Sequence, residues 1–427
     1  MAQSLAAGRG FQVAPSLPAV DVPTVPGKDG RRYSKYGLGE PVLLLPAAFA
    51  GGRNQPLVER LAAYEQAVFA ALAVLFLFLL AGAAGVGEAA ATTLALLFAF
   101  GSPQLAYAHD QFDVTASGAA LLAAVWLWLR GSVLGAGAAA GIALLIRTGN
   151  LAAIAPLAVW IGVVAPKRLP SFLAPVVLAA GVIAGYDFLR FGSIFETGYT
   201  LAPDSGRFTA PWMGAAGLLV SPGKGLLWYC PAVVLAAIGY PALFRRKPEL
   251  AIFIAAELLA NLLFYGAYQF WPGDWSWGPR YLLPVLGLVL LPAAELRRRV
   301  APALLGAAGF AVNLLDVLVD FRNVIASALI SGHDIYAPGS YWMPAESEIW
   351  RHLVALAQLA SGHGVYPAIY RQVDLQLGIP PTAWWDTWWL IDLWWGRWTA
   401  AAAVAALVAV AVECARRVGR LARSEKI

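Results

Sequence analysis

The chain has 427 residues, of which 60% are hydrophobic and 13% are charged, and its formal net charge is +5. Soluble domains are typically about 45–50% apolar and about 25% charged, so this composition excludes an ordinary soluble fold and favours a protein that lies in lipid. The small net charge gives no indication of a nucleic-acid partner, and we expect none.

About eleven long apolar segments follow one another along the chain, and a membrane-spanning helix needs about 20 mainly apolar residues. In lipid the backbone polar groups must be satisfied within each segment, and these runs are too continuously apolar for barrel strands. We therefore predict an all-α fold, a polytopic transmembrane helical bundle of about 11 spans, with interfacial helices and loops on its outer face. In chain order the spans are expected at 64–86, 88–107, 113–130, 132–147, 149–165, 170–188, 226–244, 249–269, 281–297, 301–320 and 397–415.

Basic residues cluster between or after these spans, at Lys167–Arg168, Arg245–Lys247, Arg297–Arg299 and Arg416–Lys426. The positive-inside rule places such clusters in the cytoplasm, and an even number of predicted spans separates each cluster from the next. We therefore expect a multi-pass protein of the cell inner (plasma) membrane with a cytoplasmic C-terminus.

This orientation divides the chain into four regions. They are an outer-face segment at 1–63 with an interfacial helix, a transmembrane bundle at 64–320 with outside loops at 189–225 and 270–280, an outer-face loop region at 321–396, and the last span with its basic tail at 397–427. Long loops in compact proteins are usually functional or disordered. The many Trp residues of 321–396 argue for order there, so we expect partly helical structure that covers the site or binds the acceptor.

The first 63 residues lie outside by this count, although they contain neither a full span nor a signal peptide. An outer segment needs something to carry it across the membrane, so we expect one further span upstream of Met1. In the alternative reading the segment stays in the cytoplasm and the count of spans is wrong by one.

The first polar patch on the expected outer face runs from Asp29 to Pro41 and is followed by an apolar run to Ala50 that is too short to span. We expect an interfacial helix there. Arg31, Arg32 and Lys35 carry the charges that suit a phosphate group, and anchoring to lipid headgroups is the simpler alternative.

The second patch is the short loop Tyr107–Asp113, in which His109, Asp110 and Asp113 lie close together. Asp113 stands at the start of an apolar helix, where a carboxylate can cap the helix and interact with its dipole. Capping and a catalytic role for Asp113 and Asp110 therefore stay open together.

Two further patches follow the sixth predicted span. The segment Arg190–Tyr199 combines Gly and aromatic residues with Glu196 and reads as a shaped loop over the membrane. The segment Ser221–Tyr229 places Lys224 between two glycines before a helix, where free N–H groups attract anions. A phosphate site at Lys224 and a plain loop are both consistent with this pattern.

The fifth patch, Trp271–Tyr281, brings Trp275 and Trp277 close to Arg280. Trp residues commonly form belts at the membrane surface, which is the simpler explanation. Aromatic faces also stack on sugar rings, and an Arg at this depth needs an anion. The five patches together supply cations, aromatics and a few carboxylates, which fits an anionic, sugar-bearing lipid. His and Cys are too sparse to indicate a zinc site.

At these patches the sequence resembles bacterial members of glycosyltransferase superfamily C, the group that includes the protein mannosyltransferases and the lipid A aminoarabinose transferase. The resemblance rests on GRRYSKYGLGEPVLLLP (30–46), RFGSIFETGY (190–199), SPGKGLLWY (221–229) and WSWGPRYLLP (275–284). It implies an inverting transferase that takes its sugar from a polyprenyl-phosphate donor and passes it to a lipid, glycan or protein acceptor on the outer face of the bilayer. It does not decide whether a divalent metal is a cofactor.

The resemblance also implies roles for particular residues. The main catalytic acid of the family follows its first span, and Ala2–Ala6 resembles the stretch after that acid, so the acid is expected upstream of Met1. Asp113, with Asp110, matches a second acidic position. Lys224 and Arg280 match basic positions of the family, and we infer from their charge that they, with Arg31 and Lys35, hold the donor phosphate. Sugar or acceptor contacts are expected from Glu196, Tyr199, Trp275 and Trp277.

Two alternatives remain. A transporter or lipid flippase predicts ionisable groups inside the bundle and related repeats, whereas the ionisable residues here lie at span ends and in loops, with Arg147 as the main exception. A catalytically inactive paralogue or fragment would explain the missing first acidic loop.

Overall fold

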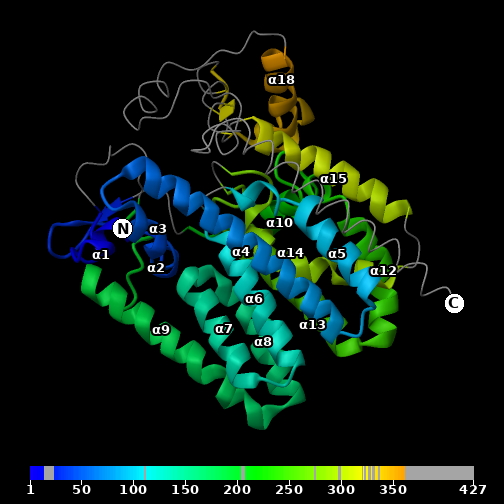
Figure 1. Ribbon diagram of the computed structural model, residues 1–427, viewed down its shortest axis with the longest axis horizontal. Helices are drawn as coiled ribbons and strands as arrows, with labels where there is room; N and C mark the ends of the chain where they lie inside the picture. The colour runs from blue at the N-terminus through cyan, green and yellow to red at the C-terminus, as the bar shows by residue number, and fades with distance from the viewer. Residues whose placement is uncertain are drawn as a thin grey trace.

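The computed structural model describes residues 1–13, 24–109, 112–202, 207–273, 276–296, 300–319, 321, 324–325, 328, 332–334 and 337–360. In this part of the chain, long apolar helices pack side by side (Figure 1). They are α4 (Gln55–Ala83), α5 (Glu88–Phe100), α6 (Val114–Leu129), α7 (Val133–Ile146), α8 (Leu151–Val164), α9 (Leu169–Phe191), α12 (Val233–Arg246), α13 (Pro248–Ala267), α14 (Leu283–Leu290) and α15 (Val300–Leu318).

Shorter elements lie between and beside these helices. The short helices are α1 (Ala2–Ala6), α2 (Gly39–Leu43), α3 (Leu45–Gly51), α10 (Pro211–Val220), α11 (Leu226–Tyr229), α17 (Pro338–Trp342) and α18 (Glu348–Ala360). The 3-10 turns are η1 (Ala106–Ala108), η2 (Thr148–Asn150), η3 (Pro166–Arg168), η4 (Arg280–Leu282), η5 (Leu291–Glu295) and η6 (Pro344–Glu346).

The chain is a largely helical membrane protein. Four helical stretches of its described part are long and apolar enough to cross a membrane, at Tyr64–Ala83, Pro166–Phe191, Pro248–Ala267 and Val300–Leu318. Shorter apolar helices stand where most of the other spans are expected. The total of about 11 crossings stays a prediction, and the span expected at 397–415 lies outside the described residues.

Proline interrupts two of the expected spans. The segment 226–244 begins as α11, breaks at Cys230–Ala232 around Pro231, and continues as α12. The segment 281–297 is divided into η4, α14 and η5. Proline has no backbone N–H and its ring collides with the preceding turn, so an apolar run that contains it need not form one helix.

The all-helical prediction is wrong for one short hairpin. Strands β1 (Thr24–Pro26) and β2 (Arg32–Ser34) pair antiparallel, with Val25 opposite Tyr33. The turn between them contains Gly30 at φ 75°, a conformation that glycine adopts without strain. The loop expected at 189–225 also contains helix α10, which Pro211 opens at a position where its missing N–H costs nothing.

Within the described residues, contacts join the segments expected outside at one end of the bundle, and the basic cluster Arg245–Lys247 lies at the other end. Tyr107 donates a hydrogen bond to the carbonyl of Trp277 (2.8 Å), and Lys28 donates one from its backbone N–H to the carbonyl of Arg190 (2.9 Å). At the opposite end Arg246 pairs with Glu295. These described contacts lie at opposite ends of the bundle, and the orientation of the chain in the membrane stays a prediction.

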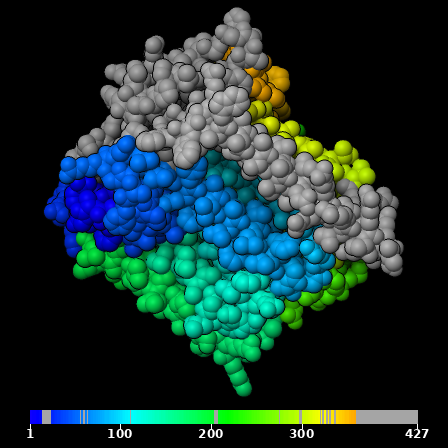
Figure 2. Space-filling model, in the orientation of Figure 1, coloured from blue at the N-terminus to red at the C-terminus, as the bar shows by residue number. Residues whose placement is uncertain are grey.

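Helix α2 lies against the end of α7 at Gly39. A Cβ added there would stand 2.4 Å from Cα and 2.5 Å from N of Ile146, and this backbone has no flexible atom that can give way. In the views of the whole chain the N-terminal residues, in dark blue, form a lobe next to the green helix α9 (Figures 1 and 2).

Replacing Gly39 by Ala is expected to push α2 away from α7 and to destabilise the protein by about 1–3 kcal/mol, the usual cost of overpacking. Thermal unfolding in detergent measures this. Gly82→Ala is the matched control, because a Cβ at Gly82 meets nothing within 4 Å. Equal melting temperatures for the two variants would show that α2 is not held against α7.

Candidate functional site

The centre of the outer end of the bundle is Arg147, which follows α7. Its Nη1 lies 2.9 Å from Oδ1 of Asp113, the residue that precedes α6. The guanidinium also faces the rings of Tyr265 (5.6 Å) and Tyr281 (4.9 Å), which stack on each other with centroids 4.6 Å apart. One cation thus joins α6, α7, α13 and η4.

Asp113 stands at the capping position of α6, as the sequence predicts, but its side chain makes no capping hydrogen bond. The carboxylate points instead to Arg147. Asp113 therefore does not cap α6 through a hydrogen bond, and it is the partner of Arg147, the main ionisable residue that the sequence analysis places inside the bundle. Asp110, the other expected carboxylate of this loop, lies outside the described residues.

A second carboxylate, Glu40 at the start of α2, lies near Asp113. Gln66 donates a hydrogen bond to Oε1 of Glu40 (2.6 Å) and accepts one from the hydroxyl of Thr115 (2.6 Å). Within the described part of the chain, Oε2 of Glu40 has no hydrogen-bond partner. Burial raises the pKa of Glu40 to about 7, and the negative charge of Asp113 adds to the effect.

The sequence analysis assigned no role to Glu40. Glu40 precedes the apolar run of the first patch, and this position is the sequence signal for it. A charged group at the border of an apolar segment has to be paired or protonated. A carboxyl group with a pKa near the working pH is suited to accept and release a proton.

Arg280 also contacts Tyr281. Its guanidinium faces the rings of Phe112 (4.8 Å) and Tyr281 (5.1 Å), so the ring of Tyr281 lies close to two cations, Arg147 and Arg280. Within the described part of the chain, its side chain makes one long hydrogen bond, to the hydroxyl of Tyr281 (3.4 Å). Among the residues that the structure describes, Nε of Arg280 has no partner and no carboxylate pairs with it.

Tyr199 and Lys35 border the same cluster. Nζ of Lys35 lies over the rings of Tyr36 (5.5 Å) and Tyr199 (5.8 Å). Burial raises the pKa of Tyr199, while the charges of Arg147 and Asp113 lower and raise it, respectively. Glu196 lies in the preceding turn, where it accepts hydrogen bonds from the backbone N–H of Gly198 (2.9 Å) and from the hydroxyl of Thr200.

Lys224 is fully buried and is neutralised by a carboxylate that the sequence analysis did not single out for this place. Its Nζ pairs with Glu348 at the start of α18 and donates to the carbonyl of Ser276. The backbone N–H of Gly278 also donates to Glu348 (3.3 Å). Burial raises the pKa of Glu348, and the positive charge of Lys224 opposes this shift.

Trp277 is fully buried beneath this pair. Its indole N–H donates to Oδ1 of Asn313 (3.0 Å), and its ring packs edge-on against Tyr229 (5.1 Å) and His352 (4.7 Å). These contacts give Trp277 a packing role in the floor below the Lys224–Glu348 pair, and a sugar contact from it stays a prediction. Trp275 lies outside the described residues.

The expected site residues therefore fall into separate groups. Asp113, Tyr199, Lys35 and Arg280 lie around Arg147 and Tyr281, while Lys224 is held by Glu348 and by the carbonyl of Ser276. Arg31 lies in a different cavity, with Arg190. In the described part of the chain, no group of three or more His, Cys, Asp or Glu side chains is placed to hold a metal ion.

No protein-family model matches this chain, and no curated protein matches it. Among solved structures it is similar to the crystal structure of ArnT from Cupriavidus metallidurans bound to undecaprenyl phosphate. That similarity has a TM-score of 0.46 and 15% sequence identity, and it covers 90% of this chain and 68% of the other. A TM-score of this size does not establish a common fold.

Proposed function

We propose that the protein is a membrane glycosyltransferase that moves a sugar from a polyprenyl-phosphate donor to an acceptor on the non-cytoplasmic face. The observation that carries the proposal is the position of Arg280. This cation and Arg147 both face the ring of Tyr281, Arg147 pairs with Asp113, and the charge of Asp113 acts on Glu40. No described carboxylate pairs with Arg280. A cation beside carboxylates is what a reaction needs when a hydroxyl loses a proton and a phosphate leaves.

The reaction divides among the residues as follows. The acceptor hydroxyl gives its proton to a carboxylate while its oxygen forms a bond to C1 of the sugar. The bond between C1 and the phosphate oxygen breaks, and the polyprenyl phosphate leaves with the electron pair. Glu40 is the proton acceptor whose pKa of about 7 suits this step. Arg280 stabilises the charge that develops on the leaving phosphate.

Asp113 remains a proposed catalytic carboxylate, together with Asp110. The ion pair with Arg147 fixes the Asp113 side chain, and the negative charge of Asp113 helps to raise the pKa of Glu40. Tyr199 and Glu196 are proposed to contact the sugar or the acceptor, and Lys35 is proposed to approach the donor phosphate from the side of Tyr199.

Lys224 is the second proposed phosphate ligand, and its pairing with Glu348 has a consequence. Because one cation cannot fully neutralise two anions, Glu348 competes with a phosphate for Lys224. The carboxylate belongs to α18, which packs against α15 (Figure 1). Movement of the start of α18 would free the lysine for the donor.

Replacing Glu348 by Gln is expected to raise the affinity for a polyprenyl phosphate about tenfold, the effect of about 1.4 kcal/mol from removing the competing charge. The variant is also expected to unfold at a lower temperature, since it leaves a buried cation unpaired. Binding in detergent, measured by native mass spectrometry, is the readout. Glu346→Gln is the matched control, because Glu346 is more exposed and lies 4.0 Å from Arg351. An unchanged affinity in Glu348→Gln would make Lys224 a structural cation only.

The transporter alternative has one specific observation in its favour. Glu257 is buried in the apolar helix α13, and in the described part of the chain its Oε2 has no hydrogen-bond partner. Ionisable groups at this depth often mark ion or substrate pathways.

One reconstitution experiment separates the two functions. The full chain is placed in liposomes with a panel of polyprenyl-phosphate sugars and a lipid acceptor, and free polyprenyl phosphate is measured by mass spectrometry. A transferase releases the carrier phosphate from at least one donor, in proportion to the glycosylated acceptor. Movement of the intact donor across the bilayer without release would identify a transporter and contradict the proposal.

A further inference from the structure

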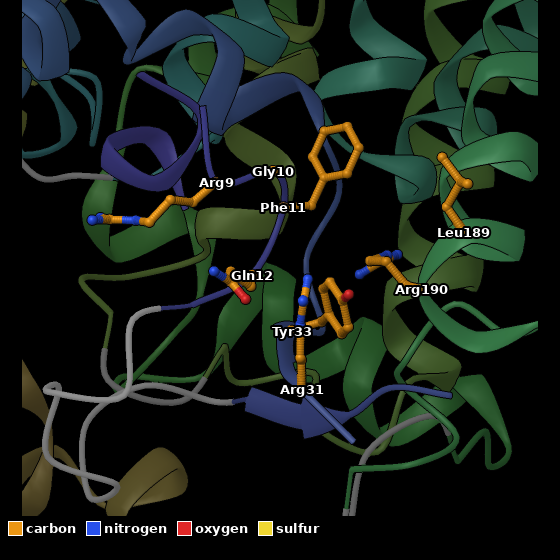
Figure 3. Close-up of a pocket in the computed structure, with 8 residues that line it drawn as sticks. All are labelled: Arg9, Gly10, Phe11, Gln12, Arg31, Tyr33, Leu189 and Arg190. Atoms are coloured by element: carbon orange, nitrogen blue, oxygen red, sulfur yellow. The ribbon is translucent and has the colours of Figure 1, made fainter. Parts of the chain in front are cut away.

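A cavity of about 220 Å³ lies between the N-terminal segment, strand β2 and the end of α9. Its walls include Arg9, Phe11, Gln12, Arg31, Tyr33 and Arg190 (Figure 3). None of these residues belongs to the Arg147–Tyr281 cluster. Pockets that hold drug-sized ligands usually measure about 300–1,000 Å³, so this cavity suits a group the size of a lipid headgroup.

The walls of the cavity are cationic. Three of the described lining residues are arginines, and none is acidic. In Figure 3 the guanidinium groups of Arg31 and Arg190 point toward the ring of Tyr33, whereas that of Arg9 points away. Guanidinium groups match the oxygens of a phosphate in geometry as well as in charge.

Arg190 lines the cavity and has one buried N–H donor that no described residue satisfies. It is 2% exposed, pairs with Asp187 through Nη2, and donates from Nη1 to the carbonyl of Ser34. Its Nε, also buried, has no hydrogen-bond partner among the described residues. A buried N–H donor without a partner is costly, and an oxygen of a ligand in the cavity would satisfy it.

Arg31 is only weakly paired within the protein, so its positive charge can attract a ligand anion. Its Nε lies 3.7 Å from Oδ2 of Asp29, in a pair whose side chains are 63% and 38% exposed, and such exposed pairs are weak. The same Oδ2 of Asp29 also accepts a hydrogen bond from the hydroxyl of Tyr33 (2.8 Å). Asp29 is therefore shared, and it does not fully neutralise Arg31.

The cavity opens where an apolar helix ends. α9 is one of the helices long enough to cross a membrane, and Leu189 in its last turn lines the cavity and is 60% exposed. Phe11 packs edge-on against Tyr186 one turn earlier (4.9 Å). Basic and aromatic residues at such a helix end lie at the level of the lipid headgroups.

We propose that this cavity binds the phosphate group of an anionic amphiphile at the membrane surface, with Arg31 and Nε of Arg190 as donors and Leu189 toward the acyl chains. The site is separate from Arg280 and Lys224. It needs no transfer chemistry, so it does not depend on the proposed transferase function.

The test measures binding of dioctanoyl phosphatidic acid to the full chain in detergent, by native mass spectrometry and by thermal shift. Arg31→Gln is expected to weaken this binding about tenfold, the value of roughly one charge-assisted hydrogen bond. Arg32→Gln is the matched control, because Arg32 is the next residue of the chain, carries the same charge, and donates to Thr24 instead. It is expected to change the affinity less than about twofold, as for an exposed charge.

Binding measurements with other ligands identify the chemical class. If inorganic phosphate binds as tightly as the lipid and depends on Arg31 in the same way, the assignment to an amphiphile is overturned. Dioctanoyl phosphatidylcholine should bind more weakly than phosphatidic acid. Equal losses in Arg31→Gln and Arg32→Gln would show general surface charge and overturn the proposal. Arg130→Gln, which removes an exposed arginine at the end of α6 and outside both proposed sites, should leave phosphatidic acid binding unchanged.

Discussion

Replacing Glu40 by Gln is expected to lower the rate of sugar transfer by about 10²–10⁴-fold, the usual contribution of a general base. Gln keeps the shape of the side chain and can still bond to Gln66, but it does not accept a proton. Release of polyprenyl phosphate from the donor measures the rate. Glu88→Gln is the control, because Glu88 is exposed at the start of α5, near the opposite end of α4. Similar rates in both variants would remove Glu40 from the mechanism.

The pH dependence of the same rate follows from the raised pKa. Burial raises the pKa of Glu40 from 4.5 to about 7, and only the deprotonated form accepts the acceptor's proton. The wild-type rate is therefore expected to rise up to about tenfold per pH unit below pH 7 and to level off above it.

The same shift predicts the opposite trend for stability. Glu40 holds its proton more tightly in the folded than in the unfolded chain, so the folded protein binds more protons between about pH 4.5 and pH 7. The contribution of Glu40 to the free energy of unfolding therefore falls as the pH rises through this window. Glu40→Gln should lose this part of the dependence. A wild-type melting temperature that changes with pH in the same way as that of the variant would contradict the raised pKa.

Replacing Arg280 by Gln is expected to lower kcat by about 10²–10³-fold, as for the loss of one donor to a developing oxyanion. The variant should also bind a polyprenyl phosphate more weakly, and Arg280→Lys should restore part of the binding. The guanidinium of Arg280 packs on the rings of Phe112 and Tyr281, and the Gln side chain can keep part of this packing, so the melting temperature should change little.

The control for this variant is Arg130→Gln, which removes an exposed arginine at the far end of α6. It should leave both the rate and the binding unchanged. A large fall in the melting temperature of Arg280→Gln, with binding intact, would show that Arg280 supports the fold instead of the donor phosphate.

Much of the helical architecture follows from the sequence because the signal is local. A run of apolar residues marks a helix in lipid whatever surrounds it, and the limits of α6 and α7 differ from the predicted spans by one residue at each end. The prediction was wrong where a single residue prevents an apolar run from forming one helix. Pro231 divides one predicted span, and the hairpin of β1 and β2 lies in a segment whose polar residues show no clear pattern.

The site was only partly predictable because its pairs join distant segments. The sequence singled out Asp113 and Arg280 by their residue type and their place at helix starts, and it marked Arg147 as an exception. The pairing of Arg147 with Asp113 and that of Lys224 with Glu348 need the fold. The raised pKa of Glu40 likewise depends on burial and on the charge of Asp113, which belongs to a distant part of the chain.

The most direct test of the proposed donor site is a structure of the full chain in a lipid nanodisc with a polyprenyl phosphate. We expect the phosphate to lie within hydrogen-bond distance of Arg280, about 2.7–2.9 Å for a charge-assisted bond, on the side of the cluster that holds Asp113 and Glu40. A phosphate bound elsewhere, with Arg280 still enclosed between Phe112 and Tyr281, would contradict the proposed function.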